Sequence, residues 1–301
     1  MRTDTYNSLT NAAFTYTKCL NDNGTISSCE GTRMPADRQT PQSSVKFLQC
    51  KFSRLLASGK NGGAICYTVS GGSLEIVECV FDTCETTINE VSGTGGGAVF
   101  VSETSEFVVS SSLFLSCVCH TSYSSDGGAI EMVDPTSTIT INNCAFVRCC
   151  AYDDGGAVCI WGCPSCYNRC FSEYRFIGCE GKDPASSDGG SLIVWNSNAV
   201  VSCSNTLFAD SHSTFHGGAA AYYIRNGISH DSSLYLFSFC FFKDNSAKDI
   251  YGADIFFEEW VPTVPFLHSY STTVSSRICY VEDSANWNVP EEFKNKDNWL
   301  P

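Results

Sequence analysis

An acidic column is the first feature of the sequence that could do chemistry. Asp126, Asp154 and Asp188 each stand directly before a Gly-Gly pair, and His216 takes the same place in a later copy. If the copies stack, neighbouring carboxylates raise each other's pKa toward the range of a general acid, as in enzymes that cleave polysaccharides. The same oxygens could bind calcium. They could also serve only turns, because Asp before Gly is a common turn pair.

Two observations make catalysis the alternative interpretation of this column. The equivalent places in the first two copies are Asn61 and Gly95, so the column is interrupted. No Lys or Arg recurs at a fixed place beside the acids, although a lyase needs a base to bind an acidic sugar. We therefore predict no catalytic residue in the first place, and Asp126, Asp154 and Asp188 as the catalytic set of the alternative.

An aromatic column is the predicted binding site. Trp161 and Trp195 occupy equivalent places in the runs AVCIW and SLIVW, and Tyr223 and Phe257 are expected to continue the column. The alternation of a strand places these side chains on the face opposite the core. Such a ridge could stack on sugars or on a partner protein, or pack beneath a loop.

The densest cysteine cluster offers a weak metal site. Cys159, Cys163, Cys166 and Cys170 could hold zinc with four thiolates. A single CxxC pair without a second one at a distance is a weak zinc signal, however, and a local disulfide or a loop insertion explains it as well. No cofactor is predicted, and zinc is kept only as an alternative.

Other cysteines recur at fixed distances from a phenylalanine. One set precedes the phenylalanine by two residues: Cys50, Cys79, Cys144 and Cys240. A second set follows it by three residues: Cys84, Cys117, Cys149 and Cys179. Stacked coils would bring equivalent Cα atoms to about 4.8 Å, which is within the disulfide range. Disulfides and ladders of buried free thiols are both open.

The elements that must position these residues form a repeat. Gly-Gly pairs recur at 62, 96, 127, 155, 189 and 217, and between them stand phenylalanines 29 to 34 residues apart. The phenylalanines are Phe52, Phe81, Phe114, Phe146, Phe176, Phe208 and Phe242. Helical periodicity is missing, and a propeller blade needs about 40 residues. The period predicts an all-β, parallel β-helix of about seven coils, with two or three short strands in each.

The runs after the Gly-Gly pairs predict which face is buried. Residues two apart share a face of a strand, and one such set is apolar in nearly every copy. That set is Ile65, Val99, Ile130, Val158, Leu192 and Ala220, with Tyr67, Val101, Met132, Ile160, Val194 and Tyr222. The alternate set admits Thr68, Ser102 and Glu131, so we expect it to face away from the core. The phenylalanines are expected to form an internal stack, with polar loops of variable length after them.

The repeat divides the chain into three parts. Residues 1–44 are polar and irregular and are predicted to be an N-terminal cap, because an uncovered solenoid end exposes strand edges. Residues 45–260 are the predicted β-helix. Residues 261–301 lose the repeat and are predicted to form a C-terminal cap and tail.

With these motifs the chain resembles the repeats of polymorphic outer-membrane proteins, whose signatures are G-G-A-[ILV] and F-x-x-N. The sequence has GGAI at 62–65 and 127–130, GGAV at 96–99 and 155–158, and FKDN at 242–245. The resemblance covers about residues 47–260. It implies a right-handed parallel β-helix that is displayed on a cell surface and used for adhesion or host interaction. The Asn is replaced in the other copies by Cys84, Cys117, Cys149, Cys179, Ser211 and Leu55.

Composition limits the partners. The net charge of −14 disfavours nucleic acid and an anionic membrane surface. No apolar stretch is long enough for membrane insertion, and the first residues lack the apolar core of a signal peptide. Nineteen cysteines are typical of an oxidising compartment. We therefore expect either a piece of a longer exported precursor or a protein with reduced thiols.

Three functions follow from the sequence. The first is a non-enzymatic surface or secreted protein that binds a protein or glycan of a host or neighbouring cell, like an adhesin. The second is a polysaccharide lyase or hydrolase, and the third is a structural spacer. An enzyme needs its carboxylates and a basic residue in an open groove, whereas a binding protein needs an exposed ridge or face.

Overall fold

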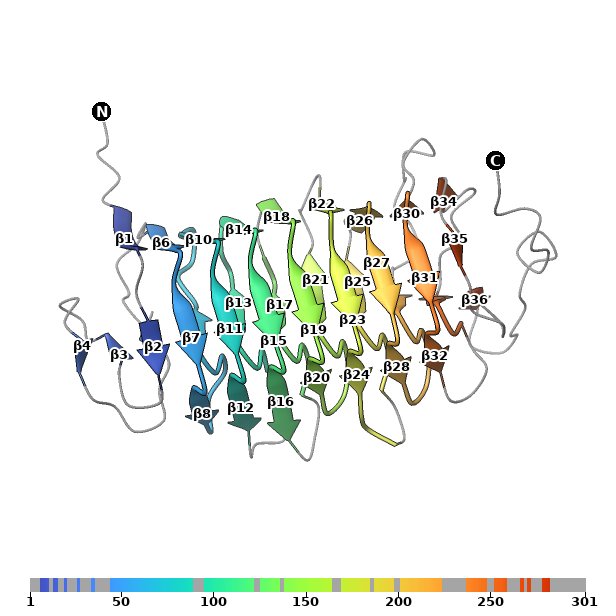
Figure 1. Cartoon of the computed structure of the whole chain (residues 1–301), viewed down its shortest axis with the longest axis horizontal. Coiled ribbons are helices and arrows are strands. Elements are labelled where there is room, and N and C mark those ends of the chain that lie inside the picture. The colour runs from blue at the N-terminus through green and yellow to red at the C-terminus, as the bar shows by residue number, and fades with distance from the viewer. Residues whose placement is uncertain are drawn as a thin grey trace.

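Each repeat folds into four short strands separated by sharp bends, and equivalent strands of successive repeats pair side by side (Figure 1). The structure is a computed structural model. It describes residues 44–88, 95–121, 125–135, 138–163, 169–184, 187–197, 201–223, 237–247 and 252–258, and short strands outside these ranges. Strands and turns form this part of the chain, and it contains no helix that could span a membrane.

Four parallel sheets run along the rod, named here in the order in which the chain visits them. The first sheet contains β1 (Tyr6–Thr10), β6 (Ser44–Leu48), β10 (Ser73–Val77), β14 (Glu106–Ser110), β18 (Thr138–Asn142), β22 (Arg169–Ser172), β26 (Val201–Ser204), β30 (Phe237–Ser238) and β34 (Phe266–Leu267). The second contains β2 (Ala13–Thr15), β7 (Lys51–Ser53), β11 (Val80–Asp82), β15 (Leu113–Leu115), β19 (Ala145–Val147), β23 (Arg175–Ile177), β27 (Leu207–Ala209), β31 (Phe241–Lys243) and β35 (Tyr270–Ser271).

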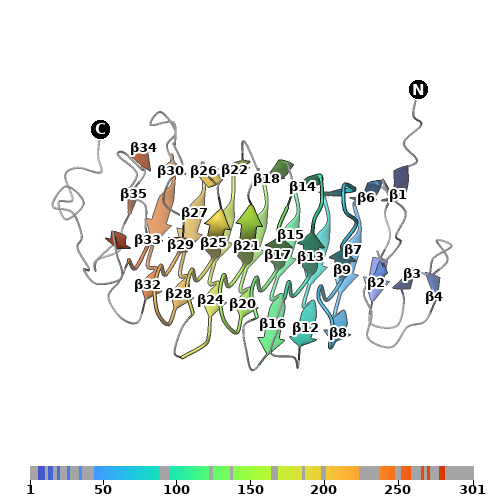
Figure 2. The same ribbon diagram turned by 180° about the vertical axis from the view of Figure 1, so that it is seen from behind.

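The remaining two sheets complete each coil (Figure 2). The third sheet contains β8 (Leu56–Ser58), β12 (Glu85–Ile88), β16 (Val118–Thr121), β20 (Cys150–Ala151), β24 (Glu180–Gly181), β28 (His212–Ser213) and β32 (Ser246–Ala247). The fourth contains β5 (Met34–Pro35), β9 (Ile65–Tyr67), β13 (Val99–Ser102), β17 (Ile130–Val133), β21 (Val158–Cys163), β25 (Leu192–Ser197), β29 (Ala220–Tyr223), β33 (Ile255–Glu258) and β36 (Ile278–Val281). A small antiparallel pair joins β3 (Cys19–Leu20) and β4 (Ile26–Ser27).

This architecture confirms the predicted all-β parallel β-helix. The prediction of two or three strands per coil was wrong, because each coil has four. The segment after each phenylalanine was expected to be a polar loop, but its first residues form the third sheet. Three strands from each predicted terminal cap, β1, β2, β5 and β34 to β36, extend the sheets in parallel.

The core contains the predicted phenylalanine stack. Phe114, Phe146 and Phe176 lie opposite one another in the parallel register of β15, β19 and β23. Their ring centroids are 4.8 and 5.0 Å apart, with nearly parallel planes. All seven phenylalanines are fully buried in one cluster with the predicted inward set of the fourth sheet. Both core predictions are therefore confirmed.

At the Gly-Gly pairs the chain enters the fourth sheet and its backbone lies in direct contact with the backbone of the third sheet. Gly127 has a φ of +62°, a conformation that L side chains rarely adopt. A Cβ at Gly128 would lie 2.5 Å from the backbone nitrogen of Cys150 in β20. Backbone therefore packs on backbone at this glycine, and the side chains that the third sheet turns toward the glycines, such as Ala57, Thr86 and Cys119, are small.

Candidate functional site

The three predicted aspartates form a series of hydrogen bonds that joins neighbouring coils. Asp126, Asp154 and Asp188 are 2 %, 6 % and 4 % exposed. The backbone N–H of Asp154 donates to Oδ1 of Asp126 at 3.2 Å, and the N–H of Asp188 donates to Oδ1 of Asp154 at 2.8 Å. The N–H of His216 completes the series at 2.9 Å from Oδ1 of Asp188. One oxygen of every carboxylate therefore accepts a bond from the next coil.

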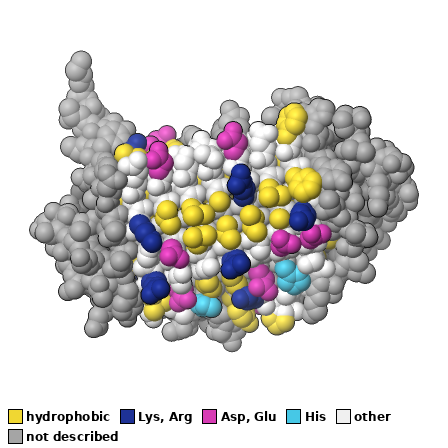
Figure 3. All heavy atoms as spheres, viewed as in Figure 1, with side chains coloured by type: hydrophobic (Ala, Val, Ile, Leu, Met, Phe, Trp, Pro, Cys, Tyr) yellow, Lys and Arg dark blue, Asp and Glu magenta, His cyan; other side chains and the backbone are white. Residues whose placement is uncertain are grey.

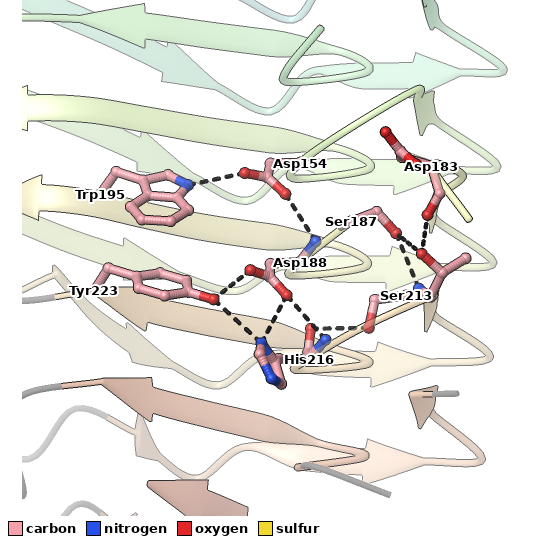
Figure 4. A network of polar contacts seen from close by, with 9 residues as sticks. Asp154, Asp183, Ser187, Asp188, Trp195, Ser213, His216 and Tyr223 are labelled. Carbon is pink, nitrogen blue, oxygen red and sulfur yellow. Dashed lines mark hydrogen bonds and ion pairs between the residues drawn. The ribbon is translucent and has the colours of Figure 1, made fainter. Parts of the chain in front are cut away.

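The second oxygen of each carboxylate accepts a bond from the aromatic column. Trp161 Nε1 donates to Oδ2 of Asp126 at 2.7 Å, and Trp195 Nε1 donates to Oδ2 of Asp154 at 3.1 Å. The Tyr223 hydroxyl donates to Oδ2 of Asp188 (Figure 4). The catalytic and binding candidates, which the sequence presented as two columns, thus form one network. We call it the acid–aromatic ladder.

The aromatic side chains stack on each other along the rod. Trp161 and Trp195 have ring centroids 5.2 Å apart, and Trp195 and Tyr223 are 3.7 Å apart, with both pairs nearly parallel. The two tryptophans are half-buried and Tyr223 is buried. A sugar binds an aromatic ring through its face, and inside this stack the faces are covered by the neighbouring rings. The predicted continuation at Phe257 was wrong, because Phe257 pairs with Tyr222 and Glu258 pairs with Tyr223.

His216 closes the ladder at one end. Its Nδ1 lies 3.1 Å from Oδ1 of Asp188 and 3.3 Å from the Tyr223 hydroxyl. The ring stacks on Phe256 with a centroid distance of 4.1 Å. The sequence placed His216 in the acidic column, but its pairing with Asp188 and its buried surroundings come from the fold.

Glu131 is a buried acid that sequence reasoning missed, as is Asp254. We expected its set to face away from the core, yet its side chain is 1 % exposed and accepts the backbone N–H of Gly95. The outer face of the fourth sheet carries a second apolar cluster, which includes Cys159 and Ile193. The apolar residues opposite Glu131 in the later strands were the available signal. They indicate that both faces of this sheet are covered.

Burial raises the pKa of the acids in this region. The pKa of Asp126 rises to about 7 because the side chain is removed from water and lies near Asp153. Burial, and then the charges of Asp126 and Asp188, raise the pKa of Asp154. Burial and the charge of Asp126 likewise raise the pKa of Glu131. Raised pKa values suit a general acid, but these carboxyls are enclosed and their oxygens already hold the coils together.

The same acids bear on the calcium alternative. Asp126, Asp153 and Asp154 each offer an oxygen within 4.8 Å of the others, and oxygen is the ligand that calcium prefers. Both oxygens of Asp126 and both of Asp154 accept N–H groups, however. A cation would have to displace these bonds between coils.

The four cysteines of the zinc alternative belong to different parts of the coil, with Cys159 in the fourth sheet and Cys170 in the first. Cys159 is fully buried in the outer cluster of the fourth sheet. Cys170 belongs to β22 in the first sheet, which pairs with β18 and β26. The side chains of Cys163, Cys166 and Cys170 lie outside the described residues.

The cysteine columns fill the corners of the coil. Cys117 and Cys149 donate their S–H groups to the carbonyls of Phe81 and Phe114 at 3.8 and 3.6 Å. The Nδ2 of Asn245 makes the same bond to a phenylalanine carbonyl at 3.1 Å. Cysteine therefore replaces the Asn of F-x-x-N because both side chains reach the preceding coil. Ten cysteines of the described part of the chain are free thiols: Cys79, Cys84, Cys117, Cys119, Cys144, Cys149, Cys150, Cys159, Cys179 and Cys203.

A flat apolar surface lies on the outside of the second sheet, where the sequence suggested no site. Its side chains flank the buried phenylalanines and are partly exposed, as in β11, β15 and β19. We call this surface the apolar face, and it consists of the partly exposed Val80, Leu113, Ala145, Leu207, Phe241, Leu115, Val147 and Ile177, together with Ala209, which is buried. Figure 3 shows hydrophobic side chains gathered in a band over these strands.

The buried acids predict a pH dependence of stability. Because the folded pKa of Asp126 is about 7 and the unfolded value is near 4, the folded state holds more protons between these values. Stability is then highest below pH 4, falls as the pH rises toward 7, and stays low above it. The full loss is about 4 kcal/mol, and roughly 2 to 3 kcal/mol of it falls between pH 5 and pH 8. Urea midpoints at pH 5 and pH 8 measure it.

Replacing Glu131 by Gln should raise the urea midpoint at pH 8 and reduce the difference between the two pH values. The amide oxygen can still accept the Gly95 N–H, while the ionisable group is gone. Glu85→Gln, on the half-exposed outer side of the third sheet, is the control and should leave the profile unchanged. An equal effect of the two substitutions would contradict the assignment.

Comparison with known proteins finds no matching family model, no matching curated protein and no matching solved structure. A function for the chain therefore has to be argued from the fold and from these surfaces.

Proposed function

We propose that this chain is a non-enzymatic binding protein that docks a protein partner on its apolar face. The observation that carries the proposal is a flat, partly exposed apolar surface over a rigid core. Exposed apolar patches of this kind commonly mark interaction sites. A spacer needs no such surface, so the apolar face favours binding over a purely structural role.

The acid–aromatic ladder argues against the hydrolase or lyase alternative. A glycosidase holds two carboxyl groups on either side of a sugar bond in an open site. Here Asp126, Asp154 and Asp188 are buried, and each carboxylate is bonded to the next coil and to an aromatic side chain. We assign the column to holding successive coils in register.

The ladder also favours a protein partner over a glycan. The predicted binding residues Trp161, Trp195 and Tyr223, which would stack on a sugar through their ring faces, cover one another's faces. The apolar face, in contrast, has aliphatic side chains in regular rows, which suit a flat protein surface. We therefore propose the apolar face, and not the aromatic column, as the binding site.

The repeat motifs support a surface or secreted location. GGAI, GGAV and FKDN resemble repeats of polymorphic outer-membrane proteins, and we propose that the solenoid is of this type. The free thiols do not oppose the location, since buried cysteines are chemically inert. Biotinylation of intact source cells with an impermeant reagent should label the chain. Labelling only after lysis would overturn the proposed location. A separate experiment, on the binding of the chain to cells, tests the apolar face.

Leu115→Asp should abolish binding of the fluorescently labelled chain to host or neighbouring cells. A buried charge at the centre of the apolar face should weaken binding at least tenfold, or about 1.4 kcal/mol. Flow cytometry measures the loss. Pretreating the cells with protease should remove the signal, whereas glycosidase treatment should leave it.

Val108→Asp is the matched control for this experiment. Val108 is also half-buried and points outward, but from β14 in the first sheet. Its variant should bind like the wild type. Equal binding of the wild type and the Leu115→Asp variant would exclude the apolar face as the docking site, and loss of signal with glycosidase alone would identify a glycan as the partner.

A further inference from the structure

The charges around the apolar face balance, although the chain as a whole carries −14. From β7 to β31, the part of the second sheet whose side chains are described, five basic and five acidic residues lie on the sheet or at its two bends: Lys51, Arg54, Arg148, Arg175 and Lys243, and Glu78, Asp82, Glu173, Asp210 and Asp244. Two copies of such an acidic chain repel each other over most of their surface. This face is a side on which they can approach without net repulsion.

The charges at the two ends of the face differ in sign along one row. The residue after each strand of the second sheet forms a corner column, which begins at Arg54 and ends at Asp210 and Asp244. These three residues are exposed. A second copy that runs in the opposite direction would bring its own Asp244 opposite Arg54.

We propose that the occupant of the apolar face is a second copy of this chain, packed face to face with the rods antiparallel. This inference rests on the proposed docking role of the same face. The two-fold axis would run along the strands and pass over β19, in the middle of the stack. Because the strands are in parallel register, that choice of axis sets every pair of facing residues.

Apolar pairs lie near the axis. Val147 would face Val147 of the second copy, Leu115 would face Ile177, and Val80 would face Leu207 farther out. At the rim, Arg54 would face Asp244 of the second copy, and the symmetry produces this ion pair twice. The same axis brings Arg148 of both copies together in the corner column, and it places Leu113 opposite Arg175 and Asp82 opposite Ala209. The opposite charges therefore meet at the ends of the face.

The second copy would also cover the exposed phenylalanine at the end of the face. Phe239 is 56 % exposed, and Phe241 beside it belongs to the apolar face. In the antiparallel arrangement the side chains of Gln49 and Lys51 of the second copy lie over them. The aliphatic stem of a lysine can cover an aromatic ring while its ammonium group stays in water.

A parallel arrangement fits the face less well. It would bring Asp210 and Asp244 of both copies to the same end of the dimer, where like charges repel. It would also place Val80 against Asp82 of the second copy. Antiparallel packing avoids these two contacts and forms the two Arg54–Asp244 ion pairs, which distinguish it from the parallel arrangement.

The size of the face fits a reversible dimer. Seven strands at about 4.8 Å and about six residues at 3.3 Å give roughly 600 Å² for each copy. The total of about 1,200 Å² lies at the lower limit of stable interfaces. We expect a dissociation constant in the micromolar range rather than a permanent dimer.

Sedimentation of the purified chain over about 1 to 200 µM tests the inference. The wild type should shift from monomer to dimer within this range. Val147→Asp should stay monomeric throughout, because two carboxylates would meet at the axis, whereas Val108→Asp in the first sheet should dimerise normally. Circular dichroism of every variant should match the wild type, which separates loss of contact from loss of fold.

A charge exchange tests the antiparallel direction. Arg54→Asp and Asp244→Arg should each weaken the dimer at least fivefold, and the double variant should recover wild-type affinity. A double variant that is weaker than either single one would exclude this direction. A wild type that is monomeric at the highest concentration would overturn the second copy as occupant, while cell binding that Leu115→Asp abolishes would still support the proposed function.

Discussion

Gly128→Ala should destabilise the chain by at least about 4 kcal/mol, which is near the whole stability of many domains. The added methyl carbon would lie 2.5 Å from the backbone nitrogen of Cys150 and closer still to the carbonyl oxygen of Gly156. These atoms belong to backbone that is bonded into the third sheet and the next coil. Neither can move without breaking ladder hydrogen bonds, so the strain cannot be relieved locally.

Gly59→Ala is the control that separates this clash from backbone strain. Gly59 has a φ of +68°, but no atom lies within 4 Å of the position that its Cβ would take. Its substitution should cost about 1 kcal/mol through the unfavourable backbone conformation alone. Thermal and urea unfolding measure both variants. Equal losses would mean that the close packing between the third and fourth sheets is not what the Gly-Gly pairs provide.

The period of the phenylalanines made the architecture predictable from the sequence. Residues such as Phe114 and Phe146 repeat in type and in spacing, so stacking them defines the register of every coil. The alternation after the Gly-Gly pairs then identified the inward residues of the fourth sheet. Both predictions rest on large apolar side chains, which leave a strong pattern because their burial dominates folding free energy.

The third sheet left no comparable pattern. Its inward positions hold small residues such as Ala57, Thr86, Cys119 and Ala151, because they pack against the glycine backbone and not against the core. Its outward positions are mixed, with Glu85 and His120 among them. Without an alternation between apolar and polar residues, these strands could not be told from loops. The count of strands per coil was wrong for this reason.

The candidate site was only half predictable. The acidic column and the first three residues of the aromatic column were located correctly, whereas Phe257 was not. The hydrogen bonds between the two columns were not predicted, because each one joins residues 35 to 41 apart in sequence. The aromatic residue always belongs to the coil after its aspartate. Sequence spacing identifies equivalent positions in successive coils, and it does not show which side chains bend toward each other across them.

The acid–aromatic ladder shows how buried acids can be tolerated in such a fold. A buried carboxylate without partners is strongly unfavourable, so it needs hydrogen bonds on both oxygens. Asp126 and Asp154 receive one bond from the backbone and one from an indole. The remaining desolvation penalty appears as the raised pKa values of these two carboxyl groups, which make the ladder sensitive to pH.

Phe146→Ala should lower the free energy of unfolding by about 3 to 5 kcal/mol. The ring is fully buried between Phe114 and Phe176, with centroids at 4.8 and 5.0 Å, and Tyr174 lies at 6.2 Å. Removing it leaves a cavity in the middle of a stack whose neighbours are held by strands on both sides. The backbone cannot close the gap without shifting several coils, so most of the lost contact is not recovered.

Phe241→Ala is the matched control, because Phe241 stands in the next-but-two strand of the same sheet and points outward. It is partly exposed on the apolar face, and its removal should cost about 1 kcal/mol or less in dilute monomer. Urea unfolding of both variants compares an inward and an outward phenylalanine of one sheet. A loss below about 1 kcal/mol for Phe146→Ala would contradict the stacked core, since a ring that is not packed between its neighbours leaves no cavity behind.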